Sequence, residues 1–205
     1  MQNNDDGNAR RTMVVYMTNV VVAACRAGSG SAGHGVWLNG NADSKSAMMA
    51  AVGVNCTIAD NAGRGLFLDS SEGSGSSVVL YNSIVARNGG DGIRTADLSA
   101  GGPAITEEFN DFYGNTGANL VRVGTGGTNA PALNGSDVTG DPRFAGAGGK
   151  AEPYNLGSGS PCFNAASAAY APDVDVLGTP RPVKRVDDIG AYELIPPRGT
   201  VILLR

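Results

Sequence analysis

The chain has 205 residues, a formal net charge of −4, and charged residues make up 17% of its composition. Sparse charge of mixed sign leaves no basic stripe that could follow a phosphate backbone, so nucleic acid is not an expected partner. No apolar run approaches the roughly 18 residues that span a bilayer, and Met1 is followed by polar residues, so neither a membrane span nor a signal peptide is expected.

The N-terminal part of the chain predicts a polar tail followed by a first turn of β-structure. Residues 1–11 are polar and are expected to be a tail or the remnant of an earlier coil. Residues 19–25 then align with 55–61, and residues 34–38 align with 64–68. These offsets, 36 and 30 residues, exceed the period found further along the chain, so residues 26–33 and 39–47 are predicted to contain loop insertions.

A unit of 27 residues recurs across residues 51–123. Four positions keep their character in every copy: Ile58, Val85 and Phe112; Asn61, Asn88 and Asn115; Gly63, Gly90 and Gly117; Leu66, Ile93 and Leu120. A period of roughly 20–50 residues indicates a repeat architecture. Each copy holds short apolar or β-branched runs separated by Asn and Gly, and none holds an amphipathic helix pattern. The sequence therefore predicts an all-β fold, a parallel β-helix (β-solenoid) of about four coils over residues 12–129.

The recurring asparagines and glycines are expected where the chain turns between strands. Asn tolerates left-handed backbone angles and can hydrogen-bond its counterpart in the next coil, so Asn61, Asn88 and Asn115 should form a ladder. The neighbouring glycines are predicted to take the positive φ angles of the same turn.

The repeat fades after Val123, and the rest of the chain is expected to close the solenoid. Residues 130–195 are predicted to be a connector and an irregular C-terminal cap, in which 141–195 cover the last apolar layer and its open edge; 196–205 form a tail. No capping segment precedes Thr12, so the N-terminal edge is expected to be open and to favour self-association.

Five short motifs of this C-terminal part occur in order: D-P-R-F at 141–144, Y-N-L at 154–156, G-S-P-C-F-N at 159–164, D-V-L-G-T-P-R-P at 175–182 and D-I-G-A-Y-E at 188–193. Together they resemble the end of the choice-of-anchor Q group of right-handed parallel β-helix proteins, within the pectate-lyase-like superfamily. The resemblance, with the usual right-handed crossover of parallel strands, implies a right-handed β-helix. It also implies an extracellular or cell-surface bacterial protein. Because no signal peptide is present and the tail is short, the chain is expected to be a C-terminal piece of a longer protein.

Alternation along the strands predicts which side chains face outward. Phe67 is expected to point outward between two inward leucines, and the repeat places Trp37, Phe67, Arg94 and Val121 in one column. Aromatic rings stack on the C–H faces of sugars, and Arg supplies forked donors. Trp37, Phe67 and Arg94 are therefore the candidate carbohydrate-binding residues, and a polysaccharide or cell-surface glycan is the candidate partner. The alternative is that the two insertions fold over these aromatics as a second, smaller core.

Two further columns place opposite charges one strand spacing apart, Arg64 beside Asp91 and Asp60 beside Arg87. The spacing favours structural cross-strand pairing. The resemblance implies an alternative, because uronate lyases of this superfamily combine Ca²⁺-binding acids with an Arg or Lys base on one face. If the chain is a polysaccharide lyase or glycoside hydrolase, its candidate catalytic residues are Arg94, Asp91, Arg64 and Asp60.

The densest acidic cluster consists of Glu107, Glu108 and Asp111. A solvated edge is the favoured interpretation, and the alternative is a cation site in which these oxygens bind Ca²⁺. No other cofactor is expected. Charges that are few and mostly paired, in an acidic chain that would repel polyuronates, favour a module that contacts carbohydrate without catalysis. Whether the protein is an enzyme stays open at this point.

Overall fold

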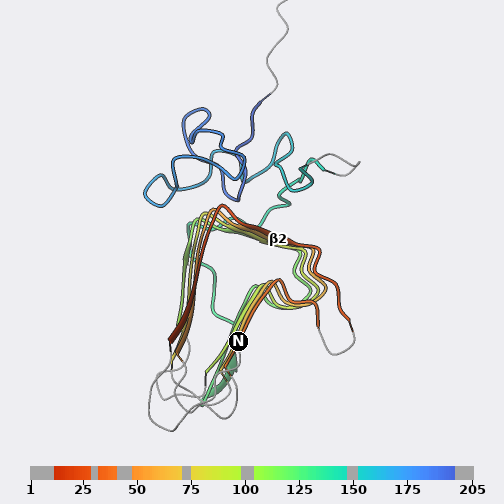
Figure 1. Ribbon diagram of the computed structural model, residues 1–205, viewed down its shortest axis with the longest axis vertical. Coiled ribbons are helices and arrows are strands. Elements are labelled where there is room, and N and C mark those ends of the chain that lie inside the picture. The colour runs from red at the N-terminus through yellow and green to blue at the C-terminus, as the bar shows by residue number, and fades with distance from the viewer. Residues whose placement is uncertain are drawn as a thin grey trace, which may run out of the picture.

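The computed structural model describes residues 12–28, 32–40, 48–70, 75–97, 104–146 and 152–196. These residues contain no α-helix and form thirteen β-strands (Figure 1). The strands are β1 (Thr12–Thr18), β2 (Val21–Ala23), β3 (Val36–Gly40), β4 (Met48–Val54), β5 (Thr57–Ala59), β6 (Leu66–Ser70), β7 (Ser76–Tyr81), β8 (Ile84–Ala86), β9 (Ile93–Asp97), β10 (Ala104–Glu108), β11 (Asp111–Tyr113), β12 (Leu120–Gly124) and β13 (Gly127–Asn129).

The strands form three parallel sheets that make three sides of one stack. The β1 sheet has the order β1-β4-β7-β10, the β2 sheet β2-β5-β8-β11, and the β3 sheet β3-β6-β9-β12, to which β13 adds an antiparallel strand. The chain visits the three sheets in turn before it returns to the first, and Figure 1 shows the successive turns lying over one another. The protein is thus all-β with stacked, mostly parallel sheets, an arrangement consistent with the β-solenoid that the repeat predicts.

The pairing register confirms the alignment derived from the repeat. Val85 pairs with Ile58 on one side and with Phe112 on the other, as the common period requires. In the first turn Val21 pairs with Thr57 and Val36 pairs with Leu66, so the longer predicted offsets are also correct.

Inward side chains from all three sheets fill the interior of the stack. Met49 and Leu80 come from the β1 sheet, Ile58 from the β2 sheet, and Leu66 and Leu68 from the β3 sheet, and none of the five is exposed. Burial of each such side chain contributes about 1.5–3 kcal/mol to folding.

Asn61, Asn88 and Asn115 form the predicted ladder. Asn61 Nδ2 donates to Asn88 Oδ1 at 2.9 Å, and Asn88 Nδ2 donates to Asn115 Oδ1 at 2.9 Å. Each side-chain amide also donates to a backbone carbonyl of the preceding turn. The ladder therefore joins each turn to the next through side chains as well as through the strands.

The left-handed backbone that was predicted at this ladder lies one residue earlier. Asp60 has a φ of 57°, Arg87 of 55° and Gly114 of 63°. A second column of left-handed residues ends the strands of the β1 sheet; it consists of Asn19, Asn55, Asn82 and Phe109. Asn is therefore used in two ways, for a side-chain ladder at one corner of the stack and for a left-handed backbone at another.

The recurring glycines are required by close packing and not by backbone angle. Gly63, Gly90 and Gly117 do not have the positive φ that was predicted for them. A Cβ on Gly117 would lie 2.3 Å from Asp91 Oδ1, and one on Gly63 would lie 2.5 Å from His34 Nδ1. At Gly63 and Gly117 the neighbouring turn lies too close for a Cβ without a shift, and at Gly90 the contact is tight, because a Cβ would lie 3.0 Å from Arg64 Cγ.

Residues 127–138 cover the C-terminal end of the stack, although they were predicted to belong to the repeats and the connector. β13 turns back along β12. Val138 extends the β2 sheet through a parallel bridge to Asp111, and Leu133 packs against the core. Residues 127–138 thus cover the last layer, which was the role predicted for 141–195.

The C-terminal segment, residues 141–146 and 152–196, lies along the side of the stack. Figure 1 shows this segment in blue beside β2. Asn19, Asn55 and Asn82, from three successive turns, donate their side-chain amides to backbone carbonyls of the segment. The predicted cap is therefore corrected to a lateral cover of the β2 sheet.

With this cover, the central strands β5 and β8 of the β2 sheet are buried on both faces. In β8, Val85 points into the stack, whereas Ile84 and Ala86 belong to a second apolar cluster with Leu156 and Ile189 of the C-terminal segment. The outward residues of this strand are apolar because the segment covers them. The predicted N-terminal tail 1–11, the centres of both insertions and most of the tail 196–205 lie outside the described residues.

Candidate functional site

The predicted aromatic column lies on the outer face of the β3 sheet. Trp37 of β3 pairs with Phe67 of β6, and Phe67 pairs with Arg94 of β9. The two rings are nearly parallel, at 8°, with centroids 6.4 Å apart. Trp37 is 48% exposed, whereas Phe67 is only 8% exposed although it points away from the core. Of the two rings, Trp37 is the one that a ligand can reach.

Two guanidinium groups share one carboxylate beside these rings. Asp91 Oδ2 lies 3.1 Å from Arg64 Nε and 3.3 Å from Arg94 Nη1. The Arg64 guanidinium also lies over the ring of Phe67, 4.6 Å from its centroid, and so helps to bury it. Three of the four candidate catalytic residues therefore come together. Since Arg keeps its proton in proteins, these two side chains are suited to donate hydrogen bonds and not to act as a base.

His34 completes this group, although it was not among the site residues predicted from the sequence. Its ring meets Trp37 edge-on, with centroids 5.7 Å apart, and Phe67 at 5.2 Å. Burial, and then the charge of Arg64, lower the pKa of His34. A signal was present in the sequence, because His34 is the only histidine and aligns with Arg64 in the repeat. We call His34, Trp37, Arg64, Phe67, Asp91 and Arg94 the aromatic site.

The burial of Phe67 also bears on the alternative of a second small core. His34 directly follows the first insertion and covers part of this ring. Residues 29–31 and 41–47 of the insertions lie outside the described residues, so cover by the insertions themselves stays a prediction.

The fourth candidate catalytic residue, Asp60, has a different partner. Both of its carboxylate oxygens accept hydrogen bonds from Arg87, at 2.8 and 2.6 Å, so the predicted cross-strand pair is present. The Arg87 guanidinium lies over the ring of Phe144, 4.8 Å from its centroid, and Phe144 packs edge-on against Tyr154. Asp60 thus belongs to a contact between the stack and the C-terminal segment.

The candidate cation ligands point to three different places. Glu107 is buried, and Glu108, its neighbour on the strand, accepts a hydrogen bond from the Tyr170 hydroxyl at 2.8 Å. Asp111 is buried and accepts a hydrogen bond from Cys162 Sγ at 3.2 Å. Within the described part of the chain, no three His, Cys, Asp or Glu side chains are placed to hold a metal ion.

Burial makes two of these carboxyl groups weak acids. Burial, and then a hydrogen bond with Asp137, raise the pKa of Glu107 to about 8. Burial raises the pKa of Asp111 to about 7, and burial together with the nearby Asp111 carboxylate raises the pKa of the Cys162 thiol. Near neutral pH a large fraction of these two buried carboxyls is therefore protonated.

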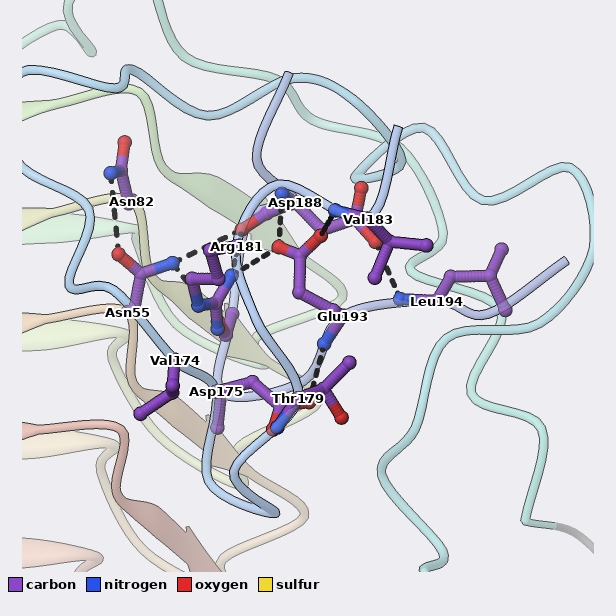
Figure 2. A network of polar contacts seen from close by, with 12 residues as sticks. Asn55, Asn82, Val174, Asp175, Thr179, Arg181, Val183, Asp188, Glu193 and Leu194 are labelled. Atoms are coloured by element: carbon purple, nitrogen blue, oxygen red, sulfur yellow. Dashed lines mark hydrogen bonds and ion pairs between the residues drawn. The ribbon is translucent and has the colours of Figure 1, made fainter. Parts of the chain in front are cut away.

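The C-terminal motifs form a buried polar network (Figure 2). Arg181 and Glu193 make an ion pair in which each side chain is only 1% exposed. The Asp175 carboxylate accepts three backbone N–H groups, one of them from Glu193. Buried charges persist only when they are paired and hydrogen-bonded. Both charges of this ion pair have such partners, although Arg181 Nε is buried and has none.

Two backbone carbonyls connect this network to the stack. The carbonyls of Asp188 and Gly190 each accept one hydrogen bond from Arg181 and one from Asn55 Nδ2 (Figure 2). Burial raises the pKa of the Asp188 side chain to about 6. The conspicuous motifs at 175–182 and 188–193 thus hold the C-terminal segment together and attach it to a left-handed corner of the stack.

Comparisons with protein families, with curated proteins and with solved structures found no match to this chain. The part of the chain that the structure describes has no helix that is long and apolar enough to cross a membrane.

Proposed function

We propose that this chain is a right-handed parallel β-helix of about four coils, related to the pectate-lyase-like superfamily and ending in a segment like that of the choice-of-anchor Q group. In this proposal it is a module of a secreted or cell-surface protein. It contacts a polysaccharide or cell-surface glycan through the aromatic site and does not cleave it.

The observation that carries this proposal is the exposure of Trp37. The parallel β3 sheet holds its indole half-exposed, with polar groups of His34, Arg64 and Arg94 nearby. Ligand sites commonly combine apolar or aromatic surface with a few fixed polar groups. A sugar chain needs this combination, because its C–H faces are apolar and its rim carries hydroxyl groups.

The partners of the charged residues favour binding over catalysis. Arg64 and Arg94 are both held by Asp91, and Asp60 is held by Arg87. Asp91 is the one carboxylate among the residues of the aromatic site, and it is paired with both arginines. The site therefore has no second carboxylate for an acid and base pair. A lyase or hydrolase acting through all of these residues would have to break three ion pairs first.

The test is a panel of soluble neutral and acidic polysaccharides, assayed with and without Ca²⁺ for binding and for bond cleavage. Trp37→Ala is expected to weaken binding at least about tenfold, as for an aromatic residue at the centre of a binding surface. Tyr16→Ala is the matched control, because Tyr16 is a more exposed aromatic, 77%, on the β1 sheet. Equal binding by wild type and Trp37→Ala would refute the site. Unsaturated uronate products that disappear in Arg94→Ala would refute the absence of catalysis.

A further inference from the structure

The His34 ring is held in one orientation. The backbone N–H of Arg64 donates to Nδ1 at 2.9 Å, and the rings of Trp37 and Phe67 pack against the imidazole at interplanar angles of 72° and 65°. Gly63 makes room for Nδ1, since a Cβ there would lie 2.5 Å from it. A rotation of the ring would break this hydrogen bond and both aromatic contacts.

This orientation determines the hydrogen-bonding character of the other ring nitrogen. Nδ1 accepts a hydrogen bond, so in the neutral ring the proton is on Nε2, which is a donor. Burial and the charge of Arg64 lower the pKa of His34 and so maintain the neutral ring near pH 7. Among the described residues, His34 makes its hydrogen bond through Nδ1, and none is found from Nε2. A half-buried donor in a fixed position is therefore available beside the exposed indole of Trp37.

The charges around this donor balance. Arg64 and Arg94 carry positive charge, Asp91 accepts hydrogen bonds from both, and Asp69 acts electrostatically on His34. These four side chains carry two positive and two negative charges. An anionic ligand would gain little attraction here and would compete with Asp91 for the guanidinium groups. An uncharged ligand with hydroxyl groups has neither disadvantage.

We propose that His34 orients a neutral sugar on the face of Trp37 by donating its Nε2–H to a hydroxyl oxygen of that sugar. This inference rests on the function proposed above and names the ligand class and the residue that sets its orientation. His34 is a positioning and specificity residue, whereas Trp37 supplies the stacking surface.

Two substitutions separate the structural role of His34 from its role toward the ligand. His34→Asn keeps an acceptor near the position of Nδ1 for the Arg64 N–H but removes the Nε2 donor. His34→Gln places an amide donor near the position of Nε2 but loses the acceptor. We expect His34→Asn to retain thermal stability and to bind about three- to tenfold more weakly, as for one lost hydrogen bond. His34→Gln should be less stable, because the Arg64 N–H loses its acceptor, and should recover part of the affinity that His34→Asn loses, because a donor is present.

The binding experiment uses cellohexaose, xylohexaose and mannohexaose as neutral probes and hexagalacturonate as the acidic probe, measured by calorimetry on the whole chain. The inference is supported if at least one neutral probe binds, if Trp37→Ala weakens this binding at least about tenfold, and if His34→Asn binds more weakly than His34→Gln. Two results overturn it while the proposed function stands: wild-type affinity in His34→Asn when Trp37→Ala has lost binding, or binding of the acidic probe alone through Trp37. If no carbohydrate binds, the proposed function itself fails.

Discussion

Replacement of Asn88 by alanine tests the ladder that joins the turns. The Asn88 side chain is 1% exposed and takes part in four hydrogen bonds. Its Oδ1 accepts from the backbone N–H and from Nδ2 of Asn61, and its Nδ2 donates to the Ile58 carbonyl and to Asn115 Oδ1. Alanine removes all four and leaves a space that is closed to water.

The expected loss is a large part of the stability of the fold. A hydrogen bond of this kind contributes about 0.5–1.5 kcal/mol net, so four of them give roughly 4 kcal/mol. Asn61 Nδ2 still donates to the Val22 carbonyl after the change, which reduces the expected loss to about 3 kcal/mol. Domains of this size are stable by only about 5–15 kcal/mol.

Asn115→Ala is the control within the same ladder. Asn115 is the last rung and is only half-buried, so water can replace the lost partners, and we expect a loss of about 1 kcal/mol. Urea unfolding followed by circular dichroism measures both variants. A loss below about 0.5 kcal/mol for Asn88→Ala, or a loss no larger than that of Asn115→Ala, would refute the reasoning.

Three further predictions concern the packing of the turns and the attachment of the C-terminal segment. Burial raises the pKa of Asp111 from 3.8 to about 7, so the folded state binds a proton that the unfolded state releases. The free energy of unfolding should therefore fall as the pH rises between these values. Asp111→Asn should flatten this slope, measured by urea unfolding at several pH values. An unchanged slope would contradict the raised pKa of Asp111. Gly92→Ala places a Cβ 2.7 Å from a backbone oxygen of the next turn and should lower the free energy of unfolding by about 1–3 kcal/mol. Gly126→Ala, with open space around it, should leave the stability unchanged. Equal melting temperatures of the two variants would show that the turns can move apart. Glu193→Gln leaves the buried Arg181 charge without its counter-charge and should lower the free energy of unfolding by about 3–5 kcal/mol. Proteolysis within residues 152–196 should begin earlier. A wild-type melting temperature and digestion pattern would contradict the role of this ion pair in holding the C-terminal segment.

The repeat predicted the register of the sheets and the composition of each column correctly, for a simple physical reason. In a stack of parallel turns every residue lies beside its equivalent one period away, so a linear pattern is also a map of lateral neighbours. Trp37, Phe67 and Arg94 could thus be placed side by side from the sequence, as could the pair formed by Asp60 and Arg87.

Contacts between different columns could not be predicted in this way. The period says nothing about how His34 turns over Phe67, or that Asp91 meets two arginines, because side-chain orientation depends on the local backbone and on packing. The glycine columns were assigned to the wrong cause for the same reason. Their positions were evident, but the close approach of the preceding turn, at Asp91, that requires Gly117 exists only in three dimensions.

The place of the C-terminal segment depended on the tertiary structure alone. The segment has no period, and much of its attachment joins backbone carbonyls to the amides of Asn19, Asn55 and Asn82, contacts that leave no pattern in the segment's own sequence. The short apolar strand Ile84–Ala86 is compatible with a cap over the end or with a cover along the side. The C-terminal segment covers the side of the stack because Ile84 and Ala86 present apolar surface on the outer face of the β2 sheet, which the segment buries. Residues 127–138 already close the C-terminal end of the stack.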